Sequence, residues 1–197
     1  MDTTTYKLKV MFLVGPLGTQ PQKEVATEYI TSKVADANGD LPEDELATLP
    51  EELERGTTAF HKLNGKPIFY DYQVKGFVKD AGQTFNGLRG VKNLRSKLDN
   101  LVFIEPRQIE LHLPEGEGIT FCERPLRAQT AMGPRVSLAR SEQLPDGTWF
   151  ECRLVVFNGP ISEPLLRDLF SYGEKKGMGQ WRNGGRGRFM FELEAVA

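Results

Sequence analysis

The sequence predicts an α+β domain whose elements follow the order strand, helix, strand, strand, helix, strand. This is the split β-α-β, ferredoxin-like (RRM-like, βαββαβ) arrangement. The order emerges when two irregular segments, residues 36–70 and 113–135, are treated as insertions after the first strand and between the second and third strands. A chain of 197 residues, 39% of them hydrophobic, is long enough to bury its own core. We therefore expect a single domain over residues 1–197.

The first half of the pattern consists of two strands and two helical segments. Residues 6–14 alternate at first and then become continuously apolar, which predicts a strand that ends at Gly15. Apolar residues recur at helical spacing over residues 21–35. After a short strand at 66–70, the apolar side chains of residues 71–81 share one helix face. Gly76 inside this second helix predicts a close backbone approach, because glycine costs helix stability.

The middle of the chain contains one more helix and two strands. Residues 87–98 predict a basic amphipathic helix, with leucine and valine on one face and Arg89, Lys92 and Arg95 around them. Strand-like segments follow at 101–104 and 108–113. Pro106 lies between them and predicts a break or bulge.

The last third predicts three further strands, one helix and a closing strand. The strands cover 119–127, 136–140 and 149–157, and Ser162 is placed to cap a helix over 163–172. Residues 188–196 alternate and close the chain. Strands 6–14 and 188–196 are expected to be neighbours in the middle of the sheet.

Composition excludes several classes of protein. No apolar run approaches the roughly 20 residues that cross a bilayer, and the N-terminus lacks the pattern of a signal peptide. Cys122 and Cys152 are too few for a four-cysteine zinc site, and two buried thiols are typical of a cytoplasmic protein. The sequence shows no metal-ligand spacing and no cofactor motif, so we expect no metal and no cofactor.

The net charge of −2 conceals an uneven distribution. Residues 1–60 hold 5 basic and 11 acidic side chains, whereas residues 61–197 hold 20 basic and 16 acidic ones. Twelve of the 13 arginines follow residue 88. Arginine suits bidentate phosphate contacts and stacking on bases, so the distribution favours an anionic partner for the second part of the chain.

The most informative segment is a glycine-rich loop at residues 173–187. It holds six glycines in 15 residues, with Lys175, Lys176, Arg182, Arg186 and Arg188 around them. Backbone amides in such turns can form anion-binding nests, and Trp181 offers a face on which a base can stack. The loop is no Walker motif, because the Gly-Lys-Ser/Thr ending is missing. A flexible connection without function is the alternative explanation.

Three segments in this order resemble the RAMP superfamily of CRISPR RNA-binding proteins. Val74-Lys75-Gly76 resembles the apolar-Lys-Gly helix opening of backbone subunits in CRISPR effector complexes. Residues 135–150, with Pro145-Asp146-Gly147-Thr148, resemble their arginine-rich segment and the strand after it, and the glycine-rich loop is the third segment. The resemblance spans roughly residues 66–197. The short chain, with Gly15-Pro16-Leu17 and the 21–35 helix, is most similar to small RAMP-like proteins of phages and prophages.

The resemblance implies a non-catalytic protein that binds single-stranded RNA, or single-stranded DNA, and assembles side by side as a homo-oligomer. It also implies CRISPR or other defence-complex subunits as partners. Together with the basic patterns above, it assigns to nucleic-acid binding Lys75, Arg89, Lys92, Arg95, Arg124, Arg127, Arg135, Arg140, Lys175, Lys176, Gly177, Gly179, Trp181, Arg182, Gly185, Arg186 and Arg188.

Two other functions stay open from the sequence. A phage protein with this fold could inhibit or mimic part of a host defence complex, with the acidic segment 36–54 as a nucleic-acid mimic. A metal-independent endoribonuclease is the second alternative. His61 is its weak catalytic candidate, and His112 alternates with apolar residues and is expected to be structural.

Overall fold

The computed structural model describes residues 2–21, 57–130 and 133–196. These residues form both helices and β-sheets. The predicted helix over 21–35 and the acidic segment 36–54 lie outside these residues. The elements are β1 (Thr3–Phe12), β2 (Gln20–Pro21), β3 (Thr58–Ala59), β4 (His61–Leu63), β5 (Lys66–Tyr70), α3 (Asp71–Thr84), η1 (Leu88–Gly90), α4 (Leu94–Leu101), β6 (Val102–Glu105), β7 (Gln108–Glu110), β8 (Thr120–Thr130), β9 (Gly133–Gln143), β10 (Trp149–Phe157), α5 (Glu163–Ser171), α6 (Gly173–Lys176), η2 (Arg182–Gly184) and β11 (Phe189–Val196).

The principal sheet has four strands in the order β11-β1-β10-β6, with every neighbouring pair antiparallel. The predicted pairing of the first and last strands is confirmed, since Leu8 lies opposite Leu193. The prediction that both lie in the middle of the sheet is wrong for the last strand. β11 pairs only with β1 among the described strands and forms an edge, whereas β1 is central.

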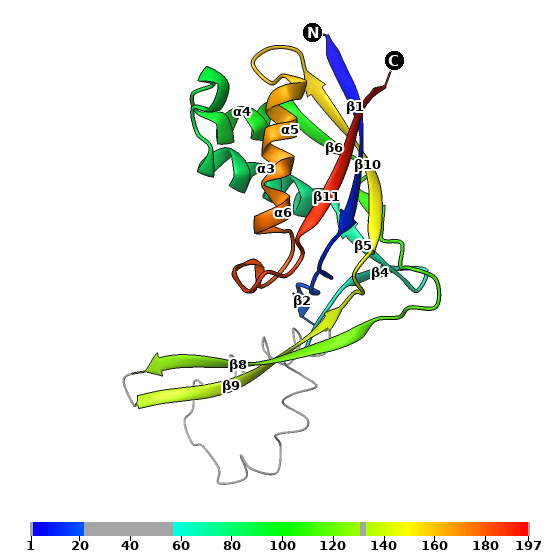
Figure 1. Cartoon of the computed structure of the whole chain (residues 1–197), viewed down its shortest axis with the longest axis vertical. Coiled ribbons are helices and arrows are strands. Elements are labelled where there is room, and N and C mark those ends of the chain that lie inside the picture. The colour runs from blue at the N-terminus through cyan, green and yellow to red at the C-terminus, as the bar shows by residue number, and fades with distance from the viewer. Residues whose placement is uncertain (1, 22–56, 131–132, 197) are drawn as a thin grey trace, which may run out of the picture.

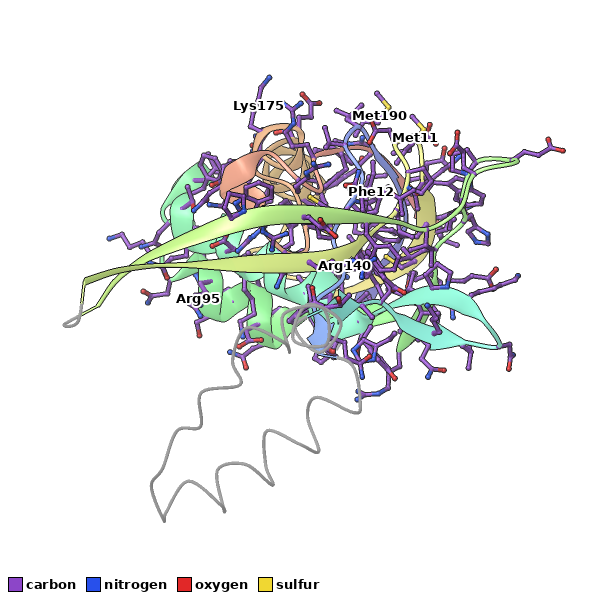
Figure 2. All side chains as sticks on the ribbon, turned by 90° about the horizontal axis from the view of Figure 1, so that it is seen from below. Met11, Phe12, Arg95, Arg140, Lys175 and Met190 are labelled. Carbon is purple, nitrogen blue, oxygen red and sulfur yellow. The ribbon has the colours of Figure 1, made fainter. Side chains whose placement is uncertain are left out.

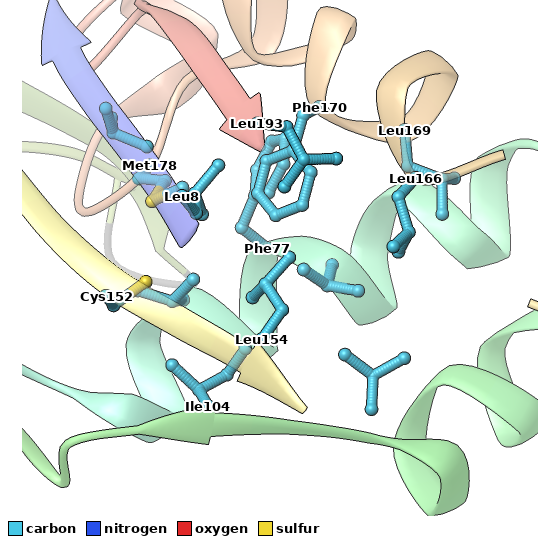
Figure 3. Close-up of a cluster of buried hydrophobic side chains, with 14 of the residues drawn as sticks. Leu8, Phe77, Ile104, Cys152, Leu154, Leu166, Leu169, Phe170, Met178 and Leu193 are labelled. Atoms are coloured by element: carbon cyan, nitrogen blue, oxygen red, sulfur yellow. The ribbon is translucent and has the colours of Figure 1, made fainter. Parts of the chain in front are cut away.

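Helices α3 and α5 cover one face of this sheet (Figure 1). Alternation along β1 places Tyr6, Leu8, Val10 and Phe12 under the helices, where they are buried. Figure 3 shows the result: Phe77 of α3 and Leu166, Leu169 and Phe170 of α5 meet Leu8 and Leu154 of the sheet. Both cysteines are free and buried, as predicted.

Two smaller sheets extend the molecule away from the helices. Strands β4, β5 and β7 form one, and β2, β3, β9 and β8 form the other. Strands β8 and β9 pair over their whole length and form a ribbon that projects beyond the rest of the fold (Figure 1). The division of the chain into a core and insertions stays a prediction.

The prediction of a single helix over residues 87–98 is wrong. Arg89 and Asn93 have positive φ angles of 51° and 54°, which break the segment into η1 and α4. Leu94 and Leu98 of α4 are still buried. The break at Pro106 is confirmed, because β6 ends at Glu105 and β7 starts at Gln108.

Gly76 does not lie against another backbone, which contradicts the prediction. It is exposed on α3, and a Cβ built there would meet no atom within 4 Å. The close approach is instead at Gly82, where a Cβ would lie 2.4 Å from Cδ1 of Leu98 in α4. Ser162 occupies the N-cap of α5, but its hydroxyl makes no capping hydrogen bond.

Candidate nucleic-acid interface

The glycine-rich loop closes on itself at a narrow neck. The amide of Met178 donates to the carbonyl of Gly187 at 2.8 Å, and Met178 is buried in the core. A Cβ at Gly187 would lie 1.8 Å from the carbonyl oxygen of Met178, and one at Gly177 would lie 2.5 Å from that of Arg186. Both glycines have positive φ angles. The neck therefore requires glycine at these two positions for packing.

The amides of Gly177 and Gly185 already have hydrogen-bond partners within the loop. The amide of Gly177 donates to the carbonyl of Gly173, and that of Gly185 donates to Arg182. These hydrogen bonds shape α6 and η2 and occupy donors that a phosphate would need. Gly179 lies against the backbone of Leu17 with a positive φ angle. These two amides are therefore not available to an anion, and the basic side chains of the loop are its other potential contacts.

Trp181 lies at the tip of the loop and outside the core, as predicted. Its side chain is 41% exposed, and its backbone adopts the left-handed conformation with φ 53°. The loop folds tightly behind it, because a Cβ at Gly184 would lie 2.8 Å from the indole ring. The guanidinium carbon of Arg124 lies 4.7 Å from the ring centroid, within cation–π range. The guanidinium of Arg124 therefore covers one face of the indole ring.

Arg124 is the centre of a polar cluster between the loop and the base of the β8–β9 hairpin. Its Nη1 donates to Oγ of Ser141 at 3.3 Å, and its Nη2 donates to Oε1 of Gln180 at 3.2 Å. Thr58 donates to Ser141 at 2.8 Å, and Ser141 donates to Gln180 at 3.1 Å. The cluster joins β3, both hairpin strands and the loop.

The described part of the chain supplies this cluster with no counter-charge. Arg124 is 7% exposed, and its Nε is buried without a hydrogen-bond partner among the described residues. Arg188 also has a buried Nε that lacks such a partner, and Arg186 donates to the sulfur of Cys122 at 3.6 Å. No described carboxylate pairs with any of the three arginines. A buried guanidinium stays charged and is costly without an anion, so this cluster is suited to an anionic ligand.

The other cations of the loop are more exposed or already paired. Arg182 pairs with Asp80 of α3 at 3.0 Å, which ties η2 to that helix. Lys175 is exposed, and Lys176 lies 3.4 Å from Oδ1 of Asn183. They add positive charge beside the Arg124 cluster.

The hairpin arginines divide between its two faces. Arg124 and Ser141 face the loop, whereas Arg140 stacks on Phe121 at 4.1 Å and pairs with Glu123 on the opposite face. Arg127 and Arg135 belong to β8 and β9, where Arg127 is opposite Val136 and Arg135 is opposite Ala128.

Lys75 has partners within the protein. Its ammonium donates to the carbonyls of Asp99 and Val102 at the end of α4, and it lies over the ring of Phe103. Burial lowers the pKa of Lys75, and the nearby Asp99 opposes that shift. The structure therefore gives Lys75 a role in joining α3 to α4.

Arg89, Lys92 and Arg95 form a second basic group around η1 and α4. Arg89 pairs with Asp168 of α5 at 2.5 Å, and Lys92 is exposed. Arg95 and Lys79 line a polar hollow of about 550 Å³ between α3 and α4. In the view of Figure 2, Arg95 and Lys175 lie on opposite sides of the hairpin.

The histidines and carboxylates of the described residues do not gather into a metal site. His61 contacts Tyr70 and Tyr72, and burial lowers its pKa. His112 stacks on Trp149 at 4.2 Å and lies 3.7 Å from Glu110. None of the described helices has both the length and the apolar character to cross a bilayer.

The sequence did not identify Thr58, Ser141 and Gln180 as site residues. They are single polar residues from three separate segments, and only folding brings them to Arg124. The one local signal is that Gln180 is adjacent to Trp181.

Comparison with known proteins gives a fold and no family. No family model matches the sequence, and neither does any curated protein. Among 148 matching chains of solved structures, one belongs to the Type III-B Cmr-beta bound to cognate target RNA, studied by cryo-EM. The TM-score is 0.53 at 11% identity, and the match covers 100% of this chain but only 62% of that chain. At this identity the likeness shows a shared fold alone.

Proposed function

We propose that the protein binds single-stranded RNA without cleaving it and assembles side by side like a backbone subunit of a CRISPR effector complex. The observation that carries the proposal is the Arg124 cluster, in which Arg124 has no described carboxylate partner, and neither has Arg186, which donates to Cys122 opposite Ser141. Exposed Trp181 lies against it. The shared fold with a chain from an RNA-bound complex supports the same function.

In this proposal the fold is a ferredoxin-like unit. Its six elements are β1, α3, β6, β10, α5 and β11, and the order β11-β1-β10-β6 places the fourth strand beside the first and the third beside the second. The β8–β9 hairpin is then inserted between the second and third strands of the unit. The hairpin and the glycine-rich loop meet at Arg124.

The uncovered face of the principal sheet is a weaker candidate for the RNA. Its centre mixes charges, since Lys7 pairs with Glu151 at 3.0 Å. A hollow of about 170 Å³ there is lined by Lys7, Lys9 and three glutamates. Fixed carboxylates beside each lysine repel a phosphate backbone, whereas the loop cluster has no described carboxylate of this kind.

RNA at the loop would use two kinds of contact. Phosphates would pair with the guanidinium groups, which donate in a planar fork. A base would stack on the open side of Trp181, opposite Arg124. Arg182, Lys175 and Lys176 would add long-range attraction.

The test is a fluorescence-anisotropy titration of labelled single-stranded RNA at about 50 and about 200 mM salt. Binding is expected to weaken steeply with salt, because each arginine–phosphate contact releases counterions. Labelled single-stranded DNA in parallel shows whether the sugar matters. Failure to bind either strand at low salt would overturn the proposal and favour an interaction protein that docks on a defence complex.

The matched variants are Arg186→Met in the cluster and Arg153→Met on the sheet. Arg153 is exposed and pairs with Glu105 at 3.6 Å, far from the loop in the strand order. Only Arg186→Met is expected to weaken RNA binding. Equal effects of both variants would show that general charge, and not the loop cluster, attracts the RNA.

A further inference from the structure

A second aromatic surface lies where β5 runs into α3, apart from the glycine-rich loop. Tyr70 and Tyr72 stack with ring centroids 5.5 Å apart and planes within 12° of parallel. His61 of β4 meets Tyr70 edge-on at 4.7 Å, and its Nε2 lies 3.4 Å from the hydroxyl of Tyr72. Three rings from three elements therefore form one preorganised group.

The outer ring of this group is open to solvent. Tyr72 is 53% exposed, although one face of its ring already lies against Tyr70. Its hydroxyl contact with His61 limits rotation of the ring. Burial lowers the pKa of His61, so the imidazole is neutral near pH 7 and can accept a hydrogen bond from the hydroxyl. A rigid, half-exposed ring binds a flat partner at little entropic cost.

The backbone at this helix start is unsuited to a phosphate. The amide of Tyr70 donates to the side chain of Gln73, that of Tyr72 donates to Asp71, and that of Asp71 donates to the carbonyl of Arg107. The amides that usually bind anions at a helix N-terminus are therefore occupied, and Asp71 adds a negative charge. A planar ligand at this surface would therefore stack on the aromatic rings, and the amides at the start of α3 would not contribute.

A cation stands beside the rings. The guanidinium of Arg107 lies 5.8 Å from the centroid of Tyr70, and its side chain is 75% exposed. Its only described ion pair is a loose one with Asp71, at 3.9 Å. Arg107 is thus free to contact the phosphate of a nucleotide whose base lies on Tyr72.

Residues 17–19 connect this surface to the glycine-rich loop. The side chain of Gln73 donates to the hydroxyl of Thr19 at 3.2 Å. Leu17 precedes Thr19 by two residues, and its backbone lies against Gly179. Gly179 in turn precedes Trp181 by two residues. Residues 17–19 therefore link the start of α3 to the glycine-rich loop within the fold.

We infer that Tyr72, backed by Tyr70 and His61, is a second stacking platform for a base of single-stranded RNA, with Arg107 as its phosphate contact. The inference rests on the proposed function and adds a contact that the loop cluster does not provide. Single-stranded RNA is recognised by splayed bases stacked on aromatic rings and arginine planes, which is the arrangement here. The occupied amides make this a contact to the base.

The experiment compares RNA affinities of Tyr72→Ala, Tyr72→Phe and Phe103→Ala by anisotropy with the same labelled RNA. Tyr72→Ala is expected to weaken binding on the order of tenfold. Tyr72→Phe keeps the ring and should bind nearly as the wild type does. Phe103 is a matched control, because it is 45% exposed, contacts another ring and has a cation over it, and it belongs to the principal sheet.

Photocrosslinking gives a readout that a structural role would not change. RNA carrying 5-iodouridine is expected to crosslink to the peptide that contains Tyr72, and Tyr72→Ala should abolish that crosslink. If wild-type protein binds RNA but Tyr72→Ala binds equally well and no crosslink forms there, this inference is wrong and the loop proposal stands. If wild-type protein binds no RNA, the proposed function itself fails.

Discussion

Replacing Arg124 by methionine separates a side chain kept for a ligand from one kept for stability. Two long hydrogen bonds and the contact with Trp181 together stabilise the folded protein by about 1.5–5 kcal/mol. Against this, burying a guanidinium without a counter-charge costs several kcal/mol, and Arg124 is 7% exposed with no described carboxylate partner. Methionine fills similar space without charge. Ser141 and Gln180 still bond to each other.

The two contributions nearly cancel, so the free energy of unfolding of Arg124→Met should lie within about 1–2 kcal/mol of the wild-type value. RNA binding should respond differently. Loss of one cation–phosphate contact reduces the slope of log affinity against log salt by about 0.7 for a single strand. Urea unfolding measures the first quantity and anisotropy at several salt concentrations the second.

The reasoning is refuted if Arg124→Met loses more than about 3 kcal/mol of stability while the affinity and salt slope of the folded protein stay unchanged. Arg124 would then be a structural arginine. Arg153→Met is the control for a general effect of charge, since Arg153 is an exposed arginine on the sheet.

Three further predictions concern the loop and the core. Trp181→Ala should weaken RNA binding on the order of tenfold with little change in melting temperature, because stacking on a base is worth about 1–3 kcal/mol; a large fall in melting temperature with unchanged affinity would contradict it. Gly187→Ala should lower the free energy of unfolding more than Gly185→Ala in urea titrations. Both have positive φ angles, but only at Gly187 would the Cβ meet a backbone oxygen, that of Met178; equal losses would refute the role of the neck. Burial raises the pKa of the Cys152 thiol to about 12, so it should resist iodoacetamide at mildly alkaline pH in the native protein and react after unfolding in urea, as mass spectrometry would show; alkylation of the native protein would contradict this burial.

The sheet was predictable because its strands alternate or run continuously apolar. Residues 6–14 and 149–157 were expected as strands and correspond to β1 and β10. The pairing of the first and last strands followed from the order of elements. The edge position of β11 did not follow, since which strand lies at an edge depends on tertiary contacts.

The errors arose where backbone conformation departs from the apolar pattern. Spacing over 87–98 fits a helix, but Arg89 and Asn93 adopt positive φ angles that periodicity cannot reveal. Gly76 and Gly82 look alike in the sequence, and only the packing of α4 shows that Gly82 is the close contact.

The candidate site was predictable in part from composition. Glycines and basic residues around Trp181 indicated the loop, and its exposure agrees. The partners of Arg124 come from β3, β9 and the loop, so no local motif announces them. Lys75 was selected by resemblance, whereas in the structure its ammonium contacts the carbonyls of Asp99 and Val102.

The most direct test of the central claim is the fluorescence of Trp181 during RNA binding. The chain has two tryptophans, so a Trp149→Phe variant reports on Trp181 alone. Adding single-stranded RNA should quench this emission saturably, along the same binding curve that anisotropy gives, because a base stacks on the indole beside Arg124. RNA that binds while the emission of Trp181 stays unchanged would contradict the account.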